Sequence, residues 1–506
     1  MQVLPPDALP VVRRKPATAS EAGLARADAA AFVLADHDPA AALAKLPHAS
    51  LWQALYRSSA KHGPKMPLLV TRLPNARHTL AAVGFLRAGT GAFERLDLAG
   101  RLMRELIKPG VVTLQCHAAA LADDESAAAL EALASAALAA AAPMPQRKSR
   151  PVPPPALRTI DVHGGRAADL EIAAAVAAGN HLARWLTTLP PNELDCPRYR
   201  RALEQLARRE GWSFRFYGER ALARLGAGAF LAVSRANGHR GAGIARLTYR
   251  PRGARRARRL GLVGKGVCFD TGGINLKAHK GMYLMHGDMQ GSAVAVGTLL
   301  ALTRSGAPLQ VDCWVALTEN EIGPRAYRPQ EVVRAMNGVT IQVVHSDAEG
   351  RMVLADTLAL ASRAKPDLLL DFATLTGACV NALTERYSGA FTNTGALEAP
   401  LQAAGRASGE RVWCFPMDED FDAELDSPIA DVMQCTADSK GDHILAARFL
   451  SRFVPGALPW IHIDLSSSER KGGLAHVPTE FTGFGVRLAA HLLGDGRLLD
   501  HLETRR

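Results

Sequence analysis

Long apolar runs are absent from this chain of 506 residues. No stretch reaches the about 18 consecutive apolar residues that a membrane-spanning helix requires, so the sequence predicts no membrane partner. Residues 1–19 carry basic side chains and four prolines, and no apolar run follows them. A secretory signal needs such a run, and we therefore do not expect one here.

Cysteine is also scarce, with seven residues that are dispersed along the chain and form no C-x-x-C pair. An odd and scattered set of this kind favours free thiols in a reducing compartment over a disulfide framework. We therefore expect a cytoplasmic protein.

Acidic residues are outnumbered, which gives a formal net charge of +11. A basic protein can present a nucleic-acid-binding surface, or it can simply carry many solvated arginines. The densest basic run, 252–259, holds five arginines between two apolar segments and is typical of an exposed connection. The solvated interpretation is therefore preferred, and nucleic acid stays a possible but not favoured partner.

The length predicts at least two domains. Residues 127–142 are almost entirely alanine and leucine, which favours a helix. The next segment, 143–155, contains six prolines, and this composition is typical of an extended linker. We therefore predict a smaller N-terminal α/β domain over 1–150 and a larger domain over 156–506.

The larger domain alternates short apolar segments with helical patterns. We predict helices at 167–186, 292–303 and 350–364, and strands at 260–263, 309–317, 341–344, 367–372 and 460–463. This alternation indicates an α/β fold with a mixed, mostly parallel sheet flanked by helices. In such sheets, functional sites form at the carboxyl ends of the strands.

Three segments at predicted strand ends bring acidic and basic side chains together. The acidic residues are Asp270, Asp288, Asp347 and Glu349, and the basic ones are Lys265, Lys277 and Arg351. Four carboxylates at one sheet edge repel one another unless counter-charge is present, and divalent ions such as Mg²⁺, Mn²⁺ or Zn²⁺ provide it. In an extended segment Asp347 and Glu349 would point the same way. A carboxylate shared by two ions would hold them about 3.5–4 Å apart, the separation used in two-metal hydrolysis.

Two other interpretations of these motifs are weaker. The Asp270-Thr271-Gly272 triplet matches the D-T-G of an aspartic protease, but that chemistry needs a second carboxylate, which only a homodimer could supply here. The glycines around Lys265 could form a phosphate-binding loop. However, a P-loop lysine is followed by serine or threonine, and Lys265 is followed by Gly266.

The strings VGKGVCFDTGG, LMHGDM and SDAEGR, with Lys277 between the first two, resemble the metal-site signature of the two-metal leucyl (cytosol) aminopeptidase family. TENEIGPRAYRP and DFATLTG resemble its flanking segments, and the resemblance covers about residues 165–495. It implies a metal-dependent aminopeptidase that removes the N-terminal residue of peptide substrates. It also implies two divalent ions per subunit, zinc or manganese, a bridging hydroxide as nucleophile, and a homohexamer.

The resemblance also assigns roles to individual residues. Asp270 and Glu349 match carboxylates that bridge both ions, and the remaining ligands match Asp347, Lys265 and Asp288. Lys277 matches the residue that polarises the scissile carbonyl. Arg351 matches the residue that holds a bicarbonate ion, the family's proposed general base. Met285, Thr374 and Gly377 match the wall of the pocket for the first side chain.

Some positions depart from the family pattern. His345 stands where asparagine is usual, His286 replaces a different side chain, Thr271 replaces serine, and DSKGDH at 438–443 replaces a more glycine-rich loop. We expect His345 to lie beside the substrate, on the same side of an extended strand as Asp347. Both histidines are expected either to orient other groups or to be solvated, rather than to ligate metal directly. A regulatory or nucleic-acid-binding scaffold on the same fold is the alternative function. Retention of every ligand position favours the enzyme.

Overall fold

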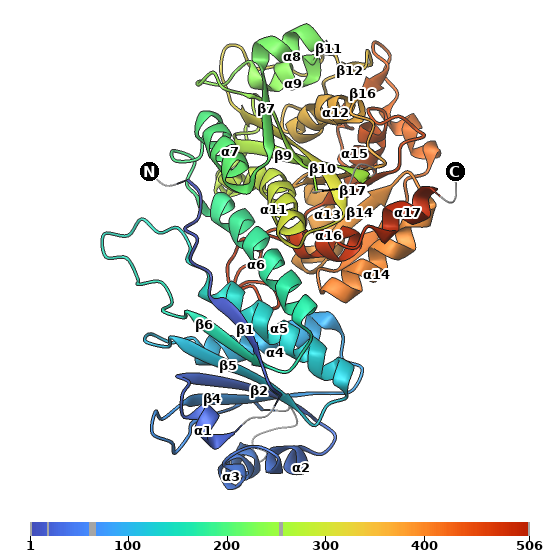
Figure 1. Ribbon diagram of the computed structural model, residues 1–506. Helices are drawn as coiled ribbons and strands as arrows, with labels where there is room; N and C mark the ends of the chain where they lie inside the picture. Colours follow the sequence, from blue (N-terminus) through green and yellow to red (C-terminus); the bar gives the residue numbers. More distant parts are fainter. Residues whose placement is uncertain (1–2, 18–19, 60–66, 252, 254–256, 504–506) are drawn as a thin grey trace.

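Two α/β units, joined by a long helix, make up the protein in this computed structural model (Figure 1). The structure describes residues 3–17, 20–59, 67–251, 253 and 257–503. Three of the five arginines of the basic run 252–259 therefore lie outside the described residues. No helix of the described part is long and apolar enough to cross a membrane.

The N-terminal unit is built on a six-stranded sheet. In spatial order its strands are β1 (Val11–Lys15), β6 (Thr159–His163), β5 (Thr113–Ala119), β2 (Ala29–Ala35), β4 (Leu80–Leu86) and β3 (Leu69–Arg72). All neighbours are parallel except β3, which is antiparallel to β4. The fully buried β2 reads AAAFVLA, a continuous apolar run that suits a strand covered on both faces.

Alternate residues of β2 face opposite sides of this sheet, because side chains alternate along a strand. Ala31 and Val33 pack with α4 (Ala92–Leu106) and α5 (Asp123–Ala141), whereas Phe32 packs with α2 (Pro39–Ala44) and α3 (Ala49–Ser59). Helix α5 confirms the alanine-rich helix that the sequence predicts.

Strand β6 follows the proline-rich segment 143–155 but pairs with β1 and β5 of the N-terminal sheet. We therefore propose that the N-terminal unit extends through His163. Its boundary with the larger unit would then lie between β6 and α6 (Ala167–Thr188) rather than within the proline-rich segment.

The larger unit contains an eight-stranded sheet. Its order is β15 (Val412–Cys414), β14 (Ser388–Thr392), β17 (Trp460–Asp464), β13 (Leu368–Ala373), β9 (Arg258–Asp270), β10 (Leu309–Asn320), β8 (Gly243–Tyr249) and β7 (Ser213–Gly218). The four central strands, β17 to β10, are parallel, and antiparallel strands flank them. This confirms the mixed, mostly parallel sheet.

Four of the five predicted strands lie in this sheet, as β9, β10, β13 and β17. The fifth, predicted at 341–344, corresponds to β12 (Thr340–Gln342). This strand instead belongs to a separate three-stranded sheet with β11 (Val332–Arg334) and β16 (Val432–Met433).

Helices cover both faces of the large sheet. One face packs against α6, α7 (Cys196–Glu210), α11 (Gln290–Arg304), α14 (Glu398–Ser408) and α16 (Val486–Leu493). The other packs against α8 (Glu219–Leu225), α9 (Gly228–Ser234), α12 (Glu349–Ser362) and α15 (Asp442–Ser451). The predicted helices at 167–186, 292–303 and 350–364 are therefore confirmed as α6, α11 and α12.

Helices α6 and α11 touch through a reciprocal pair of glycines. A Cβ added at Gly179 would lie 2.2 Å from the carbonyl oxygen of Gly297, and a Cβ at Gly297 would lie 2.5 Å from that of Gly179. Both distances are far below van der Waals contact, so the two backbones can approach this closely only because both positions lack a side chain.

Candidate metal centre and active site

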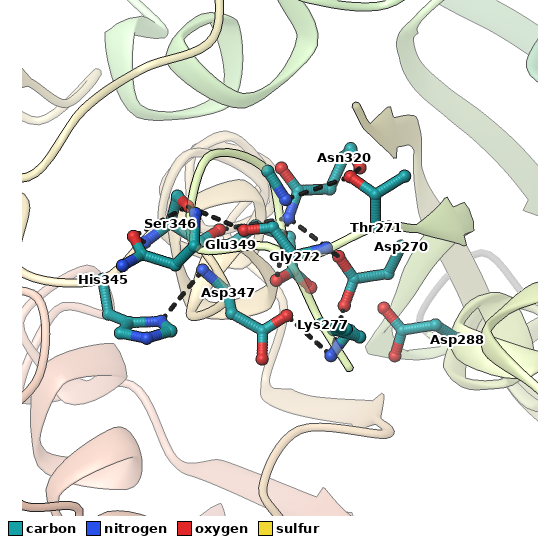
Figure 2. Close-up of polar contacts among 12 residues, drawn as sticks. Asp270, Thr271, Gly272, Lys277, Asp288, Asn320, His345, Ser346, Asp347 and Glu349 are labelled. Atoms are coloured by element: carbon teal, nitrogen blue, oxygen red, sulfur yellow. Dashed lines mark hydrogen bonds and ion pairs between the residues drawn. The ribbon is translucent and has the colours of Figure 1, made fainter. Parts of the chain in front are cut away.

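The acidic and basic side chains of the three motifs meet at the carboxyl edge of the large sheet (Figure 2). Strand β9 carries Lys265 and ends at Asp270, and the parallel strand β10 ends at Asn320 directly beside it. The Asn320 amide Nδ2 donates to Asp270 Oδ1 at 2.8 Å and to the backbone oxygen of Ser346 at 3.0 Å. Asn320 therefore joins the β9 motif to the third motif.

A glycine turn follows β9 and reverses the chain. Gly272 has φ +86°, and a Cβ there would lie 2.5 Å from the carbonyl oxygen of Asn275. Its backbone N–H donates to Asp270 Oδ1 at 2.8 Å. The turn leads to Lys277, whose Nζ lies 2.9 Å from Asp270 Oδ2 and 2.6 Å from Asp347 Oδ1.

Asp347 and Glu349 converge on this cluster by a different route from the predicted one. The extended segment expected here is wrong, because β12 ends at Gln342 and residues 346–347 form a turn. Asp347 lies in that turn, and Glu349 is the first residue of α12. Carboxylate oxygens of Asp270, Asp347 and Glu349 lie within 4.8 Å of one another, a spacing that could hold a metal ion.

Lys265 is buried among carboxylates. Its Nζ donates to Asp288 Oδ1 and to the backbone oxygen of Thr374, both at 2.8 Å, and lies 3.0 Å from Glu349 Oε1. Burial alone would lower the Lys265 pKa, but the adjacent carboxylates outweigh it and raise the pKa above its ordinary value. The Lys265 ammonium is therefore a counter-charge within this group of carboxylates.

Asp288 lies in the short 3₁₀ segment Met285–Met289, and only one of its two carboxylate oxygens is hydrogen-bonded among the described residues. Its Oδ1 accepts from Lys265 and from the Thr374 hydroxyl, whereas its buried Oδ2 has no hydrogen-bond partner among the described residues. Burial raises the Asp288 pKa to about 6, against the opposing effect of Lys265. A buried carboxylate oxygen without a partner is costly unless a cation or proton satisfies it.

The donor set fits divalent metal ions. Carboxylate oxygens with a single nitrogen donor suit Mg²⁺, Mn²⁺ and Zn²⁺. The excess negative charge is balanced here only by two lysines, and an oxygen of Asp288 is left without a partner among the described residues. All five predicted ligands, Lys265, Asp270, Asp288, Asp347 and Glu349, line one cavity of about 870 Å³.

The same cavity is lined by the remaining predicted site residues, which are Lys277, Met285, His345, Arg351, Thr374 and Gly377. Thr374 follows β13. Asp464, at the end of β17, holds the turn that follows Thr374. The Asp464 carboxylate accepts from the Leu375 backbone at 3.1 Å and from the Thr376 hydroxyl at 2.7 Å. This explains why the DFATLTG segment lies at the cavity wall.

Arg351 is 2% exposed and is already paired. Its Nη2 donates to both carboxylate oxygens of Asp442 at 2.8 Å, and its Nη1 donates to the backbone oxygen of Gln434 at 3.1 Å. Asp442 belongs to the DSKGDH segment and lines the cavity. The arginine for which the family resemblance implies a bicarbonate ion is therefore paired with a carboxylate of the chain itself.

The two histidines behave differently. His345 is exposed, and its Nδ1 accepts the backbone N–H of Asp347 at 3.2 Å, so it stabilises the turn that presents that carboxylate (Figure 2). The His286 ring packs edge-on against Phe481, with centroids 5.4 Å apart, and burial lowers its pKa.

Two groups that position the site were not among the predicted site residues. The Tyr327 hydroxyl donates to the Ser346 backbone oxygen at 2.6 Å, and Asn320 contacts both Asp270 and Ser346. Both lie in the TENEIGPRAYRP segment, whose sequence alone predicted no role for either residue. The parallel register of β9 and β10 would have singled out Asn320, because it places Asn320 opposite Asp270.

A family model described as the cytosol aminopeptidase family, catalytic domain, matches residues 181–490. The chain therefore belongs to the cytosol aminopeptidase family. The probable cytosol aminopeptidase of Afipia carboxidovorans is 38% identical over 335 residues, which span 66% of this chain and 65% of that protein. That of Corynebacterium diphtheriae is 35% identical and is matched over 70% of its length. The first curated relatives are thus matched over slightly less than two thirds of their length.

Solved structures agree with the fold over nearly the whole chain. The bottromycin maturation enzyme BotP in complex with Mn is 30% identical with a TM-score of 0.79, over 94% of this chain and 100% of that chain. The cytosol aminopeptidase from Coxiella burnetii is 25% identical with a TM-score of 0.78, over 95% of this chain and 98% of that one. A mutant of tomato leucine aminopeptidase, 24% identical with a TM-score of 0.84, shows the same fold.

His345 offers a first test of the site. The change His345→Asn should keep an acceptor for the Asp347 N–H and therefore retain bound metal, while it alters the preference among aminoacyl substrates. The change His345→Ala removes the acceptor and should lower kcat/KM about 10-fold or more, as loss of such orienting partners commonly does. Metal content and kcat/KM measured on the same preparations separate the two effects. A fall in metal content with His345→Asn would instead identify His345 as a ligand.

Proposed function

We propose that this protein is a metal-dependent aminopeptidase that hydrolyses the N-terminal residue from peptides at a two-metal centre, with a bridging hydroxide as nucleophile. The observation that carries the proposal is the convergence of Lys265, Asp270, Asp288, Asp347 and Glu349 in one cavity, beside Lys277. Family membership supports it, as does the similarity to BotP, a maturation enzyme whose structure is known in complex with Mn.

The family resemblance assigns the roles of the residues. Asp270 and Glu349 would supply carboxylates to both ions, and Asp347, Lys265 and Asp288 would complete the set of ligands. The contacts of these residues with one another and with Lys277 support this assignment. Bound ions would supply Lewis acidity and lower the pKa of a water molecule enough to make it a nucleophile near neutral pH.

The chain itself would bind and orient the peptide. Met285, Thr374 and Gly377 line the cavity and would form the wall against the first side chain. Lys277 would place its ammonium on the scissile carbonyl oxygen, where positive charge is most useful as that oxygen becomes negative. The glycines flanking Lys265 lie within strand β9, which argues against a phosphate-binding loop.

Metal dependence is the direct test. Prolonged dialysis against a chelator should abolish hydrolysis of aminoacyl-anilide substrates, and added Mn²⁺ or Zn²⁺ should restore it. Turnover before dialysis, after dialysis and after addition of each metal would be measured together with metal content. Full activity in a verified metal-free sample would contradict the proposal. Lack of turnover with both metals bound would favour the scaffold function, which salt-dependent DNA retention would then test.

We also propose a cytoplasmic homohexamer. The support is the family membership and the names of the curated relatives. Static light scattering at working concentration should give about six times the 53.9 kDa mass of one chain. A stable and fully active monomer would contradict this assembly.

A further inference from the structure

Among the carboxylates that line the cavity without a predicted ligand role, Asp442 is the one that pairs with Arg351. Asp442 is the first residue of α15, and its side chain is 18% exposed, so it reaches the cavity while one edge is held by Arg351. Arg351 contributes a single nitrogen, Nη2, at 2.8 Å from both Asp442 oxygens. The remaining lone pairs of the carboxylate are therefore free of this arginine.

A bicarbonate ion does not fit beside Arg351 in this chain. Nη2 donates to Asp442 and Nη1 to the Gln434 carbonyl, while the buried Nε has no hydrogen-bond partner among the described residues, and the guanidinium side chain is only 2% exposed. An added anion at this face would lie against the Asp442 carboxylate, and like charges at close range repel strongly. The chain thus supplies in covalent form the kind of group, an oxyanion paired with arginine, that the site would otherwise recruit from solution.

We propose that Asp442 is the general base of this site and makes bicarbonate unnecessary. This inference rests on the proposed aminopeptidase function. Asp442 accepts the proton that a water molecule loses when it becomes the nucleophilic hydroxide, whose oxygen then bonds to the scissile carbonyl carbon. The protonated carboxyl then returns that proton to the leaving amine nitrogen as the C–N bond breaks, so Asp442 ends as a carboxylate.

The position of Asp442 is fixed before substrate arrives. The preceding Gly441 has φ +59° and is the N-cap residue of α15, while Gln434 connects the segment before this helix to the site. The Gln434 side chain accepts from the His345 N–H at 3.1 Å and donates to the Ala348 carbonyl at 2.9 Å. Arg351, Gln434 and Asp442 therefore form one unit with the turn that presents Asp347.

Two substitutions separate a proton acceptor from a structural anchor for Arg351. Asp442→Asn keeps the size of the side chain and an acceptor oxygen for Arg351 but cannot take a proton. It should lower kcat by about 10²-fold or more, the usual effect of removing a general base, with metal content unchanged. Asp442→Gly removes the carboxylate that pairs with Arg351. This variant should therefore lose activity in carbonate-free buffer, and its activity should rise at least about 10-fold on addition of bicarbonate.

Bicarbonate binding gives a readout that is independent of activity. In thermal-shift measurements with the metal-loaded protein, bicarbonate should raise the Tm of Asp442→Gly above that seen with chloride at equal ionic strength. It should not do so for the unsubstituted protein or for Asp442→Asn, because ligand binding to the folded state alone raises stability. Asp438→Gly, in the same loop but with its ion pair to exposed Lys440, is the matched control and should behave as the unsubstituted protein.

Three results would overturn the proposal. These are an Asp442→Asn protein with full kcat, an unsubstituted protein whose turnover or Tm depends on bicarbonate, and an Asp442→Gly protein that is fully active without it. A chain without metal-dependent peptidase activity would defeat the proposed function instead. In that case the Tm response of Asp442→Gly would still report whether Asp442 occupies an anion site.

Discussion

Replacing Lys277 by methionine is expected to lower kcat about 10²–10³-fold while bound metal stays unchanged, because removal of one group that stabilises a developing oxyanion has an effect of this size. In the structure the Lys277 ammonium lies between Asp270 and Asp347. Divalent ions would neutralise those carboxylates and leave the ammonium available to a substrate carbonyl. The change removes charge but keeps a side chain of similar length.

Lys280→Met is the matched control, since Lys280 is exposed and lies three residues further along the chain. Both variants would be compared for metal content and for kcat and KM separately. If Lys277→Met lost metal in proportion to activity, Lys277 would be a structural counter-ion rather than a group that acts on the substrate.

The second large effect is expected in stability. Arg487 of α16 makes a two-pronged ion pair with Glu131 of α5, with both oxygens at 2.8 Å, and its Nε donates to the Ser408 carbonyl at 2.7 Å. The pair joins the N-terminal unit to the larger unit and is largely buried, with side chains 5% and 19% exposed. Glu131→Gln would leave the guanidinium without its counter-charge and should lower the free energy of unfolding by about 3–5 kcal/mol.

This effect should depend on pH in a defined direction. Burial would raise the Glu131 pKa, but Arg487 outweighs it and lowers the pKa to about 2 from an ordinary 4.5. A carboxyl group whose pKa is lower in the folded state than in the unfolded state contributes its full stabilisation at pH values above its unfolded-state pKa. This contribution is lost as the pH falls through the folded-state pKa. The stability difference between the unsubstituted protein and Glu131→Gln should therefore shrink between about pH 4.5 and pH 2.

Urea unfolding across this pH range measures the difference directly. Asp124→Asn, on the same helix, breaks only an exposed pair with Arg166 and should change stability little. A loss with Glu131→Gln no larger than that of this control would show that the pair is not stabilising. The Glu131→Gln/Arg487→Met double variant should lose less than the sum of the single changes, because the two side chains interact directly.

Much of this fold could be predicted from local sequence, because its central elements carry strong patterns. The apolar strands β10, β13 and β17 and the helices α11 and α12 were predicted close to their observed bounds, whereas β9 was predicted only over 260–263 and extends to Asp270. Strand β6 shows where local reasoning fails. The proline-rich segment before it suggests a linker, but the pairing of β6 with β1 and β5 is decided by residues more than 40 positions away in the chain.

The site shows the same division. The motif residues were predicted because carboxylates and lysines at strand ends have a recognisable chemistry, and the cavity does bring them together. Their local geometry was not predicted, because Asp347 and Glu349 converge through a turn and the start of a helix rather than along a strand. The Arg351–Asp442 pair spans 91 positions, and no spacing rule could have revealed it.

The glycine contact between α6 and α11 influences the position of Asp288 in the acidic cluster. Helix α11 begins immediately after the 3₁₀ segment that carries Asp288, and α6 packs at its other end against α5 of the N-terminal unit. Because no side chain lies between Gly179 and Gly297, backbone contact fixes the distance between α6 and α11. The position of Asp288 therefore depends on a contact between two helices that is made by backbone atoms alone. An extra methyl group at either glycine, remote from the acidic cluster, would change the distance between Asp288 and Lys265.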